Sequence, residues 1–203
     1  MSNYKWLIDE GHGGMLSGDY VTAPKKMFKF PDGLTIYEGV INRKIGERLY
    51  KLLTNDKVDV DFISDEIDDL SLQVRVQRAD NRFQKDKRCI FLSIHSNAGG
   101  GSGFEIFTSK GQTKSDKVAQ IFCEVYKLSF PKHPFRNDQA DGDDDKESEF
   151  YVLRKTDCPA VLVENLFFDN RKEAEYLLSD KGQQEIAECL FICIQTVEKL
   201  KPI

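Results

Sequence analysis

Residues 89–94, with the sequence CIFLSI, decide the fold that this chain predicts. Such a nearly unbroken apolar run is typical of a strand buried on both faces of a sheet. Further runs at 6–8, 58–63, 103–107 and 160–163 also predict strands. Helical periodicities lie between these runs, so strands and helices alternate along the chain. We therefore predict a single α/β domain with a mostly parallel (mixed), twisted sheet of about six strands, flanked by helices on both faces.

Apolar residues at helical spacing predict helices in the gaps between the strands. The first is expected at 39–54, and the second at 71–84, where the Ser71 hydroxyl is suited to cap the helix. Two more are expected around 118–128 and 186–197. The side chains expected to face the core are Ile41, Ile45, Leu49, Leu52 and Leu53 in the first helix, Leu72, Val76 and Ala79 in the second, Val118, Ile121, Phe122, Val125 and Leu128 in the third, and Ile186, Leu190, Ile194 and Val197 in the last.

Two segments lack such periodicity. Residues 15–37 contain several Gly and Pro residues, so we expect a long loop, which in a compact domain is usually functional. In the polar segment 131–149, acidic residues alternate from Asp141 onward, which superficially resembles a calcium-binding loop. An EF-hand loop needs Gly at its sixth position and Glu at its twelfth, whereas Lys146 and Val152 stand there. We expect a solvated loop on the rim of a groove, with calcium binding as the alternative.

Length and composition limit the function classes. A chain of 203 residues suits one domain, so we expect 1–203 to be a single unit. Its 29 Lys and Arg against 34 Asp and Glu give a net charge of −5, which argues against a nucleic-acid partner. No run approaches the roughly 18–20 apolar residues needed to cross a bilayer, so no membrane span is expected. The five scattered cysteines are expected to be reduced and mostly buried.

Three polar residues stand where predicted strands end or a helix begins. His12 follows the first strand, His95 follows the strand at 89–94, and Glu38 stands at the start of the first helix. Ligands of open α/β sheets usually bind beyond the carboxyl ends of the strands. Two histidines and one glutamate are a common ligand set for catalytic zinc. Their spacings of 26 and 57 residues match no local zinc motif.

Glu164 ends the strand at 160–163, where an ionised carboxylate needs a partner or a polar cavity. Zinc-assisted hydrolysis needs a nearby base, and Glu164 has the right chemistry for that role. Each residue also has a plainer interpretation. His12 can be a loop histidine, His95 a hydrogen-bonded core histidine, Glu38 a carboxylate at a helix N-terminus and Glu164 a buried ion-pair partner. The residues alone leave these alternatives open.

Four short strings occur in an order that resembles one family. They are LIDEGHGG at 7–14, YEGVIN at 37–42, SIHSNA at 93–98 and AVLVEN at 160–165, with RADN at 78–81 as a compressed fifth element. They resemble the motifs of zinc-dependent N-acetylmuramoyl-L-alanine amidases of the amidase-3 type, found among bacterial cell-wall hydrolases and phage endolysins. The resemblance covers nearly the whole chain.

The resemblance implies that His12, Glu38 and His95 bind one Zn²⁺ ion and that Glu164 is the catalytic acid/base. It implies hydrolysis of the amide between N-acetylmuramic acid and L-alanine in peptidoglycan. Asp9 is expected to orient His12, as carboxylates often do for metal-bound imidazoles, although it could instead cap the strand end. The chain departs from the family at Glu10, where proline is usual.

A zinc carboxypeptidase or endopeptidase that cuts another amide of the stem peptide is the alternative activity, and a metal-free wall-binding module is a third class. We expect peptidoglycan as the partner, a monomer, and no separate cell-wall-binding domain. The first residues lack a signal-peptide pattern. We therefore expect synthesis in the cytoplasm and action on the wall after release through a holin, lysis or another export route.

Overall fold

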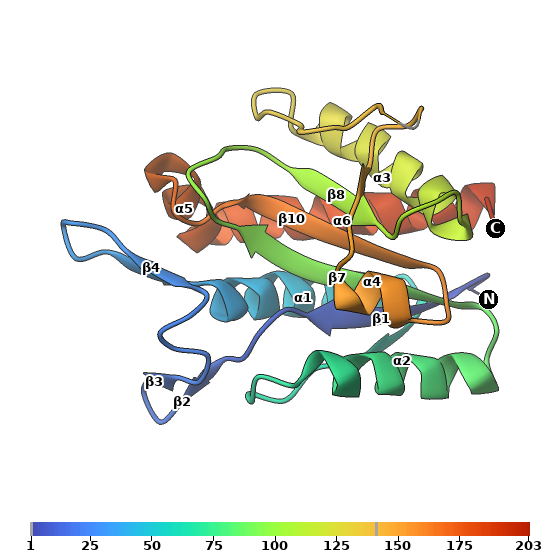
Figure 1. The fold of residues 1–203 in the computed structure, drawn as a ribbon, viewed down its shortest axis with the longest axis horizontal. Helices are drawn as coiled ribbons and strands as arrows, with labels where there is room; N and C mark the ends of the chain where they lie inside the picture. The colour runs from blue at the N-terminus through green and yellow to red at the C-terminus, as the bar shows by residue number, and fades with distance from the viewer. Residues whose placement is uncertain (1, 141) are drawn as a thin grey trace.

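A computed structural model describes residues 2–140 and 142–203 of the chain (Figure 1). Its main sheet has the strand order β6 (Asp59–Phe62), β1 (Lys5–Glu10), β7 (Cys89–Asn97), β10 (Ala160–Phe167), β8 (Glu105–Thr108) and β9 (Lys146–Glu147). The pairs β1–β6, β1–β7 and β7–β10 are parallel, whereas β8 runs antiparallel to β10. The predicted mostly parallel sheet of about six strands is therefore confirmed.

Helices cover both faces of this sheet (Figure 1). One face packs against α1 (Glu38–Asn55), α3 (Lys114–Ser129), α5 (Arg171–Leu178) and α6 (Asp180–Leu200), and the other against α2 (Leu72–Lys85) and α4 (Tyr151–Lys155). Successive strand residues point to opposite faces, so Trp6 and Ile8 join the first core and Leu7 the second. The unbroken apolar runs in the sequence reflect this double burial. The short helices α4 and α5 were not predicted.

Two side chains predicted to face the core are exposed. Leu72 is 49% exposed in the first turn of α2, and Leu128 is 81% exposed in the last turn of α3. Leu128 lies ten residues after Val118, which places it about 80° around the helix from Val118. The buried face of α3 that contains Val118 therefore does not include Leu128. The Ser71 cap is confirmed, because its side chain accepts a hydrogen bond from the Val74 amide.

The core makes a direct prediction about stability. Leu49 of α1 is fully buried, so Leu49→Ala should lower the free energy of unfolding by about 2–5 kcal/mol. Leu128→Ala removes the same atoms from an exposed site and should change it by about 0.5 kcal/mol or less. Urea denaturation of both variants checks this pair. Equal losses would contradict the assignment of Leu49 to the core.

The prediction of a long loop at 15–37 is wrong in part. Two small antiparallel hairpins form there, β2 (Met15–Leu16) with β3 (Asp19–Tyr20) and β4 (Met27–Lys29) with β5 (Thr35–Tyr37). The first turn places Ser17 at φ 52° and Gly18 at φ 93°. Two successive left-handed residues match the twist of a tight hairpin. These hairpins lie beside the carboxyl ends of the main strands (Figure 1).

The prediction of a solvated loop at 131–149 is also wrong in part, because strand β9 lies in this segment. Asp145 is buried, and its Oδ2 accepts a hydrogen bond of 2.7 Å from Thr108 Oγ1. Asp141, where the acidic alternation begins, lies outside the described residues. The side chain of Lys146 pairs with Glu105 of β8, which anchors the segment to the sheet.

Two remaining features concern the cysteines and the apolar character of the helices. The five cysteines are free and buried, as the sequence predicts. Within the described part of the chain, none of the helices combines the length and apolar character that a bilayer crossing needs.

Candidate active site

The predicted site residues meet at one edge of the sheet. His12 follows β1, His95 lies near the end of β7, and Glu164 pairs with His95 in the register of β10 and β7. Glu38 is the first residue of α1, which begins at the same edge, on the left in Figure 1. Because parallel strands end together, residues far apart in sequence are brought side by side.

Three of these side chains converge on a common centre. Glu38 Oε1 lies 3.3 Å from His12 Nε2 and 3.0 Å from His95 Nδ1. The two imidazole rings meet edge to face, with centroids 5.0 Å apart. One nitrogen or oxygen atom from each residue lies within 4.8 Å of the others. Such spacing is compatible with three ligands around a single metal ion.

The donor atoms fit a zinc ion. His12 Nε2 and Glu38 Oε2 are buried and only weakly partnered among the described residues, by Glu38 Oε1 at 3.3 Å and by Lys26 Nζ at 3.5 Å. Incompletely satisfied buried polar atoms are costly, and a bound metal ion would account for them. Two imidazole nitrogens and a carboxylate oxygen are donors that Zn²⁺ accepts in catalytic sites. Calcium prefers oxygen ligands, so two imidazole nitrogens favour zinc over calcium at this cluster.

The electrostatics keep these groups in their ligating forms. Burial raises the pKa of Glu38, but hydrogen bonds from His12 and His95 outweigh burial and bring that pKa well below its usual range. Burial lowers the pKa of His12, against the opposing effect of Glu38. A carboxylate and a neutral imidazole are therefore favoured, and these are the forms that bind metals.

The backbone around His12 is specialised. His12 has φ 70°, in the left-handed region that non-glycine residues seldom adopt. Its carbonyl accepts a hydrogen bond from Arg43 of α1. The next amide, that of Gly13, donates to Thr22 Oγ1. Strained residues persist where their surroundings hold them, often at functional sites.

Gly11 lets the His95 ring reach the centre. A Cβ atom at Gly11 would stand 2.2 Å from His95 Cε1, well inside van der Waals contact. Gly11→Ala should therefore displace the ring and weaken zinc binding by at least about tenfold, as loss of ligand support does. In the control Gly14→Ala, the new Cβ would come no closer than 3.3 Å, to Arg43 Nε. Zinc affinities from chelator competition test the pair, and equal affinities would contradict this packing.

Asp9 was expected to orient His12, but in the structure its carboxylate binds other residues. Asp9 is buried, and its two oxygens accept hydrogen bonds from Arg75 Nη1 at 2.5 Å and Ser93 Oγ at 2.7 Å. The carboxylate that faces His12 Nδ1 is that of Asp69, at 3.9 Å. Asp69 also pairs with Arg75. Sequence reasoning missed both residues because neither lies at a strand end or in a matched motif.

Glu10 replaces the proline that is usual in the family's first turn. It is the last residue of β1, is buried, and pairs with Arg43 at 3.1 Å. Burial raises the pKa of Glu10 to about 8. Arg43 also donates a hydrogen bond to the His12 carbonyl. Through Arg43, the Glu10 carboxylate is therefore linked to the backbone of the site. The RADN element lies on α2, where Arg78 pairs with Glu66.

A bulge in β10 directly follows Glu164. The register between β10 and β7 shifts between Glu164 and Phe167, and Leu166 has φ 64°. Bulges of this kind re-aim side chains next to active sites. Glu164 Oε2 is buried without a hydrogen-bond partner among the described residues. Burial, with a further contribution from the nearby Glu38, raises the pKa of Glu164 well above its usual range.

A cavity of about 270 Å³ contains His12, His95 and Glu164 together. Its lining includes the apolar side chains of Leu72, Phe150, Val152 and Leu162, and also Lys26 of the loop before β4. Sequence reasoning missed these lining residues. The exposed Leu72 thus forms part of the pocket rather than of the core.

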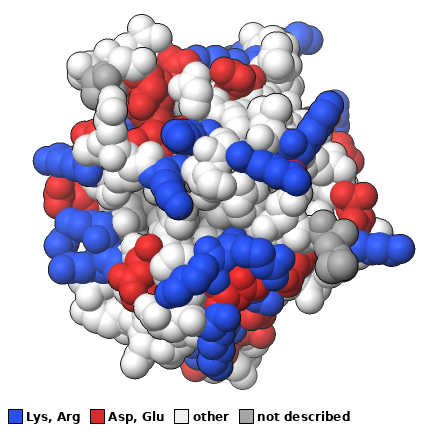
Figure 2. All heavy atoms as spheres, turned by 90° about the vertical axis from the view of Figure 1, so that its right-hand side faces the viewer, with Lys and Arg blue, Asp and Glu red and all other residues white. Residues whose placement is uncertain are grey.

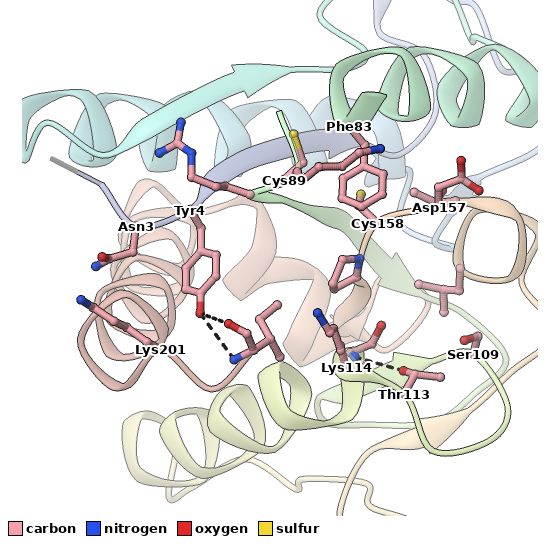
Figure 3. Close-up of a pocket in the computed structure, with 17 residues that line it drawn as sticks. Asn3, Tyr4, Phe83, Cys89, Ser109, Thr113, Lys114, Asp157, Cys158 and Lys201 are labelled. Carbon is pink, nitrogen blue, oxygen red and sulfur yellow. Dashed lines mark hydrogen bonds between the residues drawn. The ribbon is translucent and has the colours of Figure 1, made fainter. Parts of the chain in front are cut away.

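A larger cavity of about 690 Å³ lies at the opposite end of the sheet, where β7 and β10 begin. Tyr4, Phe83 and Cys158 line it (Figure 3). Lys and Arg side chains are numerous on this end of the molecule (Figure 2). It contains none of the predicted site residues, so we identify the site by its chemistry rather than by cavity size.

The sequence of this chain is similar to those of known amidases. Residues 7–196 match the N-acetylmuramoyl-L-alanine amidase family. The chain is 32% identical over 194 residues to the endolysin of Bacillus phage SPP1, covering 93% of this chain and 63% of that protein. It is 32% identical over 187 residues to the N-acetylmuramoyl-L-alanine amidase CwlM of Bacillus licheniformis, covering 90% and 64%. The chain thus spans less than two thirds of the length of these relatives.

A solved structure supports the fold. The N-acetylmuramoyl-L-alanine amidase from Clostridium difficile 630 superposes with a TM-score of 0.76 at 25% identity. The match covers 99% of this chain and all of the other. The arrangement of sheet and helices is therefore that of solved amidases.

Proposed function

Because the chain belongs to the N-acetylmuramoyl-L-alanine amidase family, we propose that it is a zinc-dependent hydrolase of the amide between N-acetylmuramic acid and L-alanine in peptidoglycan. The observation that carries the proposal is the convergence of His12, Glu38 and His95, together with a pocket that His12 and His95 line with Glu164. This arrangement has both a ligand set and a separate proton carrier. Action on the cell wall follows from the substrate.

His12, Glu38 and His95 would hold the zinc ion through one atom each. Bound zinc supplies Lewis-acid chemistry, since it polarises a carbonyl group and makes water more acidic. The buried Glu38 carboxylate faces both imidazoles and keeps them oriented toward the centre. Apolar side chains, among them Leu72, Phe150 and Val152, also line the pocket and offer a surface that excludes water around a bound substrate.

Glu164 would move the proton that hydrolysis requires. Its carboxylate takes a proton from the attacking water, whose oxygen bonds to the lactyl carbonyl carbon. The same proton then passes to the alanine nitrogen as the C–N bond breaks. The products are a lactyl carboxylic acid and a free L-alanine amine, so one water is consumed. Its burial without a hydrogen-bond partner leaves Glu164 Oε2 free for this exchange.

The cleaved bond distinguishes this function from a carboxypeptidase or endopeptidase on the same stem peptide. Purified sacculi digested with the protein should release peptides that begin with L-alanine and glycans that end in free lactyl groups. Mass spectrometry identifies both new ends. New ends inside the stem peptide would support the endopeptidase alternative instead, and intact sacculi would support a binding module.

A further inference from the structure

Lys26 lines the pocket, and its one ion pair among the described residues is with Glu38. It stands just before β4, lines the cavity that contains Glu164, and has its side chain 47% exposed. Its nearest carboxylate oxygen is Glu38 Oε2, 3.5 Å from Lys26 Nζ. Glu38 also faces both histidines, so Lys26 shares this carboxylate with the proposed metal centre.

The other cation in the pocket is fully engaged. Arg75 is buried and donates from Nη1 to Asp9 and to the Glu10 carbonyl. Its Nε donates to the Leu70 carbonyl, and its Nη2 pairs with Asp69. Arg75 has little capacity left for a ligand. Lys26 is therefore the lining cation that can turn toward an incoming anionic group.

The backbone holds Lys26 in place beside the site. Lys26 has φ 58°, in the left-handed region, and its carbonyl accepts a 2.9 Å hydrogen bond from the Glu38 amide. The strained residue is thus tied directly to the start of α1. Strain of this kind is retained where surrounding structure and function require it. The root of the Lys26 side chain is consequently fixed, while its ammonium group remains accessible.

The pocket is lined by two chemically different sets of side chains. Leu72, Phe150 and Val152 are apolar lining residues, whereas the Lys26 ammonium lies 3.5 Å from Glu38, the carboxylate that faces His12. A muramyl peptide offers matching groups, since the alanine methyl is apolar and the residue that follows carries a carboxyl group. Charge-assisted hydrogen bonds between ammonium and carboxylate groups are among the stronger ones.

We propose that Lys26 is a specificity-determining residue that binds the free carboxylate of the stem-peptide residue after L-alanine. This inference rests on the proposed amidase function and adds a preference among its substrates. It involves binding alone, with no further bond made or broken. A ligand-positioning role for Lys26 on Glu38 is the competing explanation, and it predicts an effect that does not depend on the substrate.

Two synthetic muramyl dipeptides test the proposal. They are identical except that the carboxyl group beside the α-carbon of the second residue is free in one and a carboxamide in the other. The wild-type protein should show a kcat/KM about tenfold higher for the free acid, the size expected for one charge-assisted contact. Lys26→Gln should remove this preference by lowering kcat/KM for the acid alone. Lys26→Arg should retain part of it.

Lys25→Gln is the matched control, because Lys25 is an exposed neighbour that does not line the pocket. It should keep the wild-type preference. Equal cleavage of both peptides by the wild type would overturn the role of Lys26 while leaving the amidase function intact. A Lys26→Gln variant that cleaves both peptides equally less well and binds zinc more weakly would assign Lys26 to Glu38 instead. If the wild type cleaves neither peptide, the proposed function itself fails, and this inference fails with it.

Discussion

Glu164→Gln is expected to lower kcat/KM for amide cleavage by about 100- to 10,000-fold, the range for loss of a general acid/base. Glutamine matches the size of glutamate, so the β10 bulge and the pocket should keep their shape. The amide cannot accept the proton of the attacking water, and this is the physical reason for the loss. Steady-state hydrolysis of a soluble muramyl dipeptide measures the effect.

Zinc content separates a chemical defect from a structural one. The Glu164→Gln variant should bind zinc as the wild type does, because Glu164 is outside the cluster of His12, Glu38 and His95. Glu149→Gln changes an exposed glutamate that pairs with Arg154 and does not line the pocket, so it should leave the rate unchanged. A Glu164→Gln variant with wild-type turnover would assign the proton transfer to another group.

His95→Ala should abolish stable zinc binding and, with it, the activity. Even residues that only support metal ligands cost about 10- to 100-fold in affinity when removed, so losing a ligand should exceed 100-fold. The His95 ring is also the nearest of the three side chains that contact Glu38 Oε1, and its loss leaves that buried carboxylate less well compensated. Metal analysis after dialysis, together with chelator competition, measures the affinity.

His133 offers a control of the same residue type. Its ring packs beside Phe104, Phe130 and Tyr176, with centroids 5.4–6.1 Å away, and takes no part in the three-residue cluster. His133→Ala should lower stability and leave zinc affinity unchanged. Equal loss of zinc in both histidine variants would point to general unfolding, and retention of zinc by His95→Ala would contradict the ligand assignment.

Periodicity predicted the main elements well because it is a local property. The apolar run at 89–94 became the central strand β7, and the spacing of Ile41, Ile45 and Leu49 predicted α1. Elements whose formation depends on distant partners were missed. Strand β9 forms by pairing with β8, and no apolar alternation in its own sequence indicates it.

The residues of the site were also predicted only in part, because the strand pattern indicates some of them and not others. His12, His95 and Glu164 follow or end apolar strands, so their position at one edge of the sheet follows from the strand pattern. Lys26 had no such signal, because the segment around it shows no periodicity and its hairpin was predicted as a loop. Asp69 lies between a strand and a helix, in a segment that sequence reasoning did not assign to the site.

The sequence by itself determined the α/β architecture, the family motifs and the identity of the residues placed at the edge of the sheet. Only the tertiary structure decided that Glu38 faces both histidines, that the His95 ring lies over Gly11, and that Asp69 rather than Asp9 faces His12. Hydrophobic periodicity is a local property, which a short stretch of consecutive residues is enough to reveal. Convergence of side chains instead depends on strand register, close backbone approach and packing between segments that are distant in sequence.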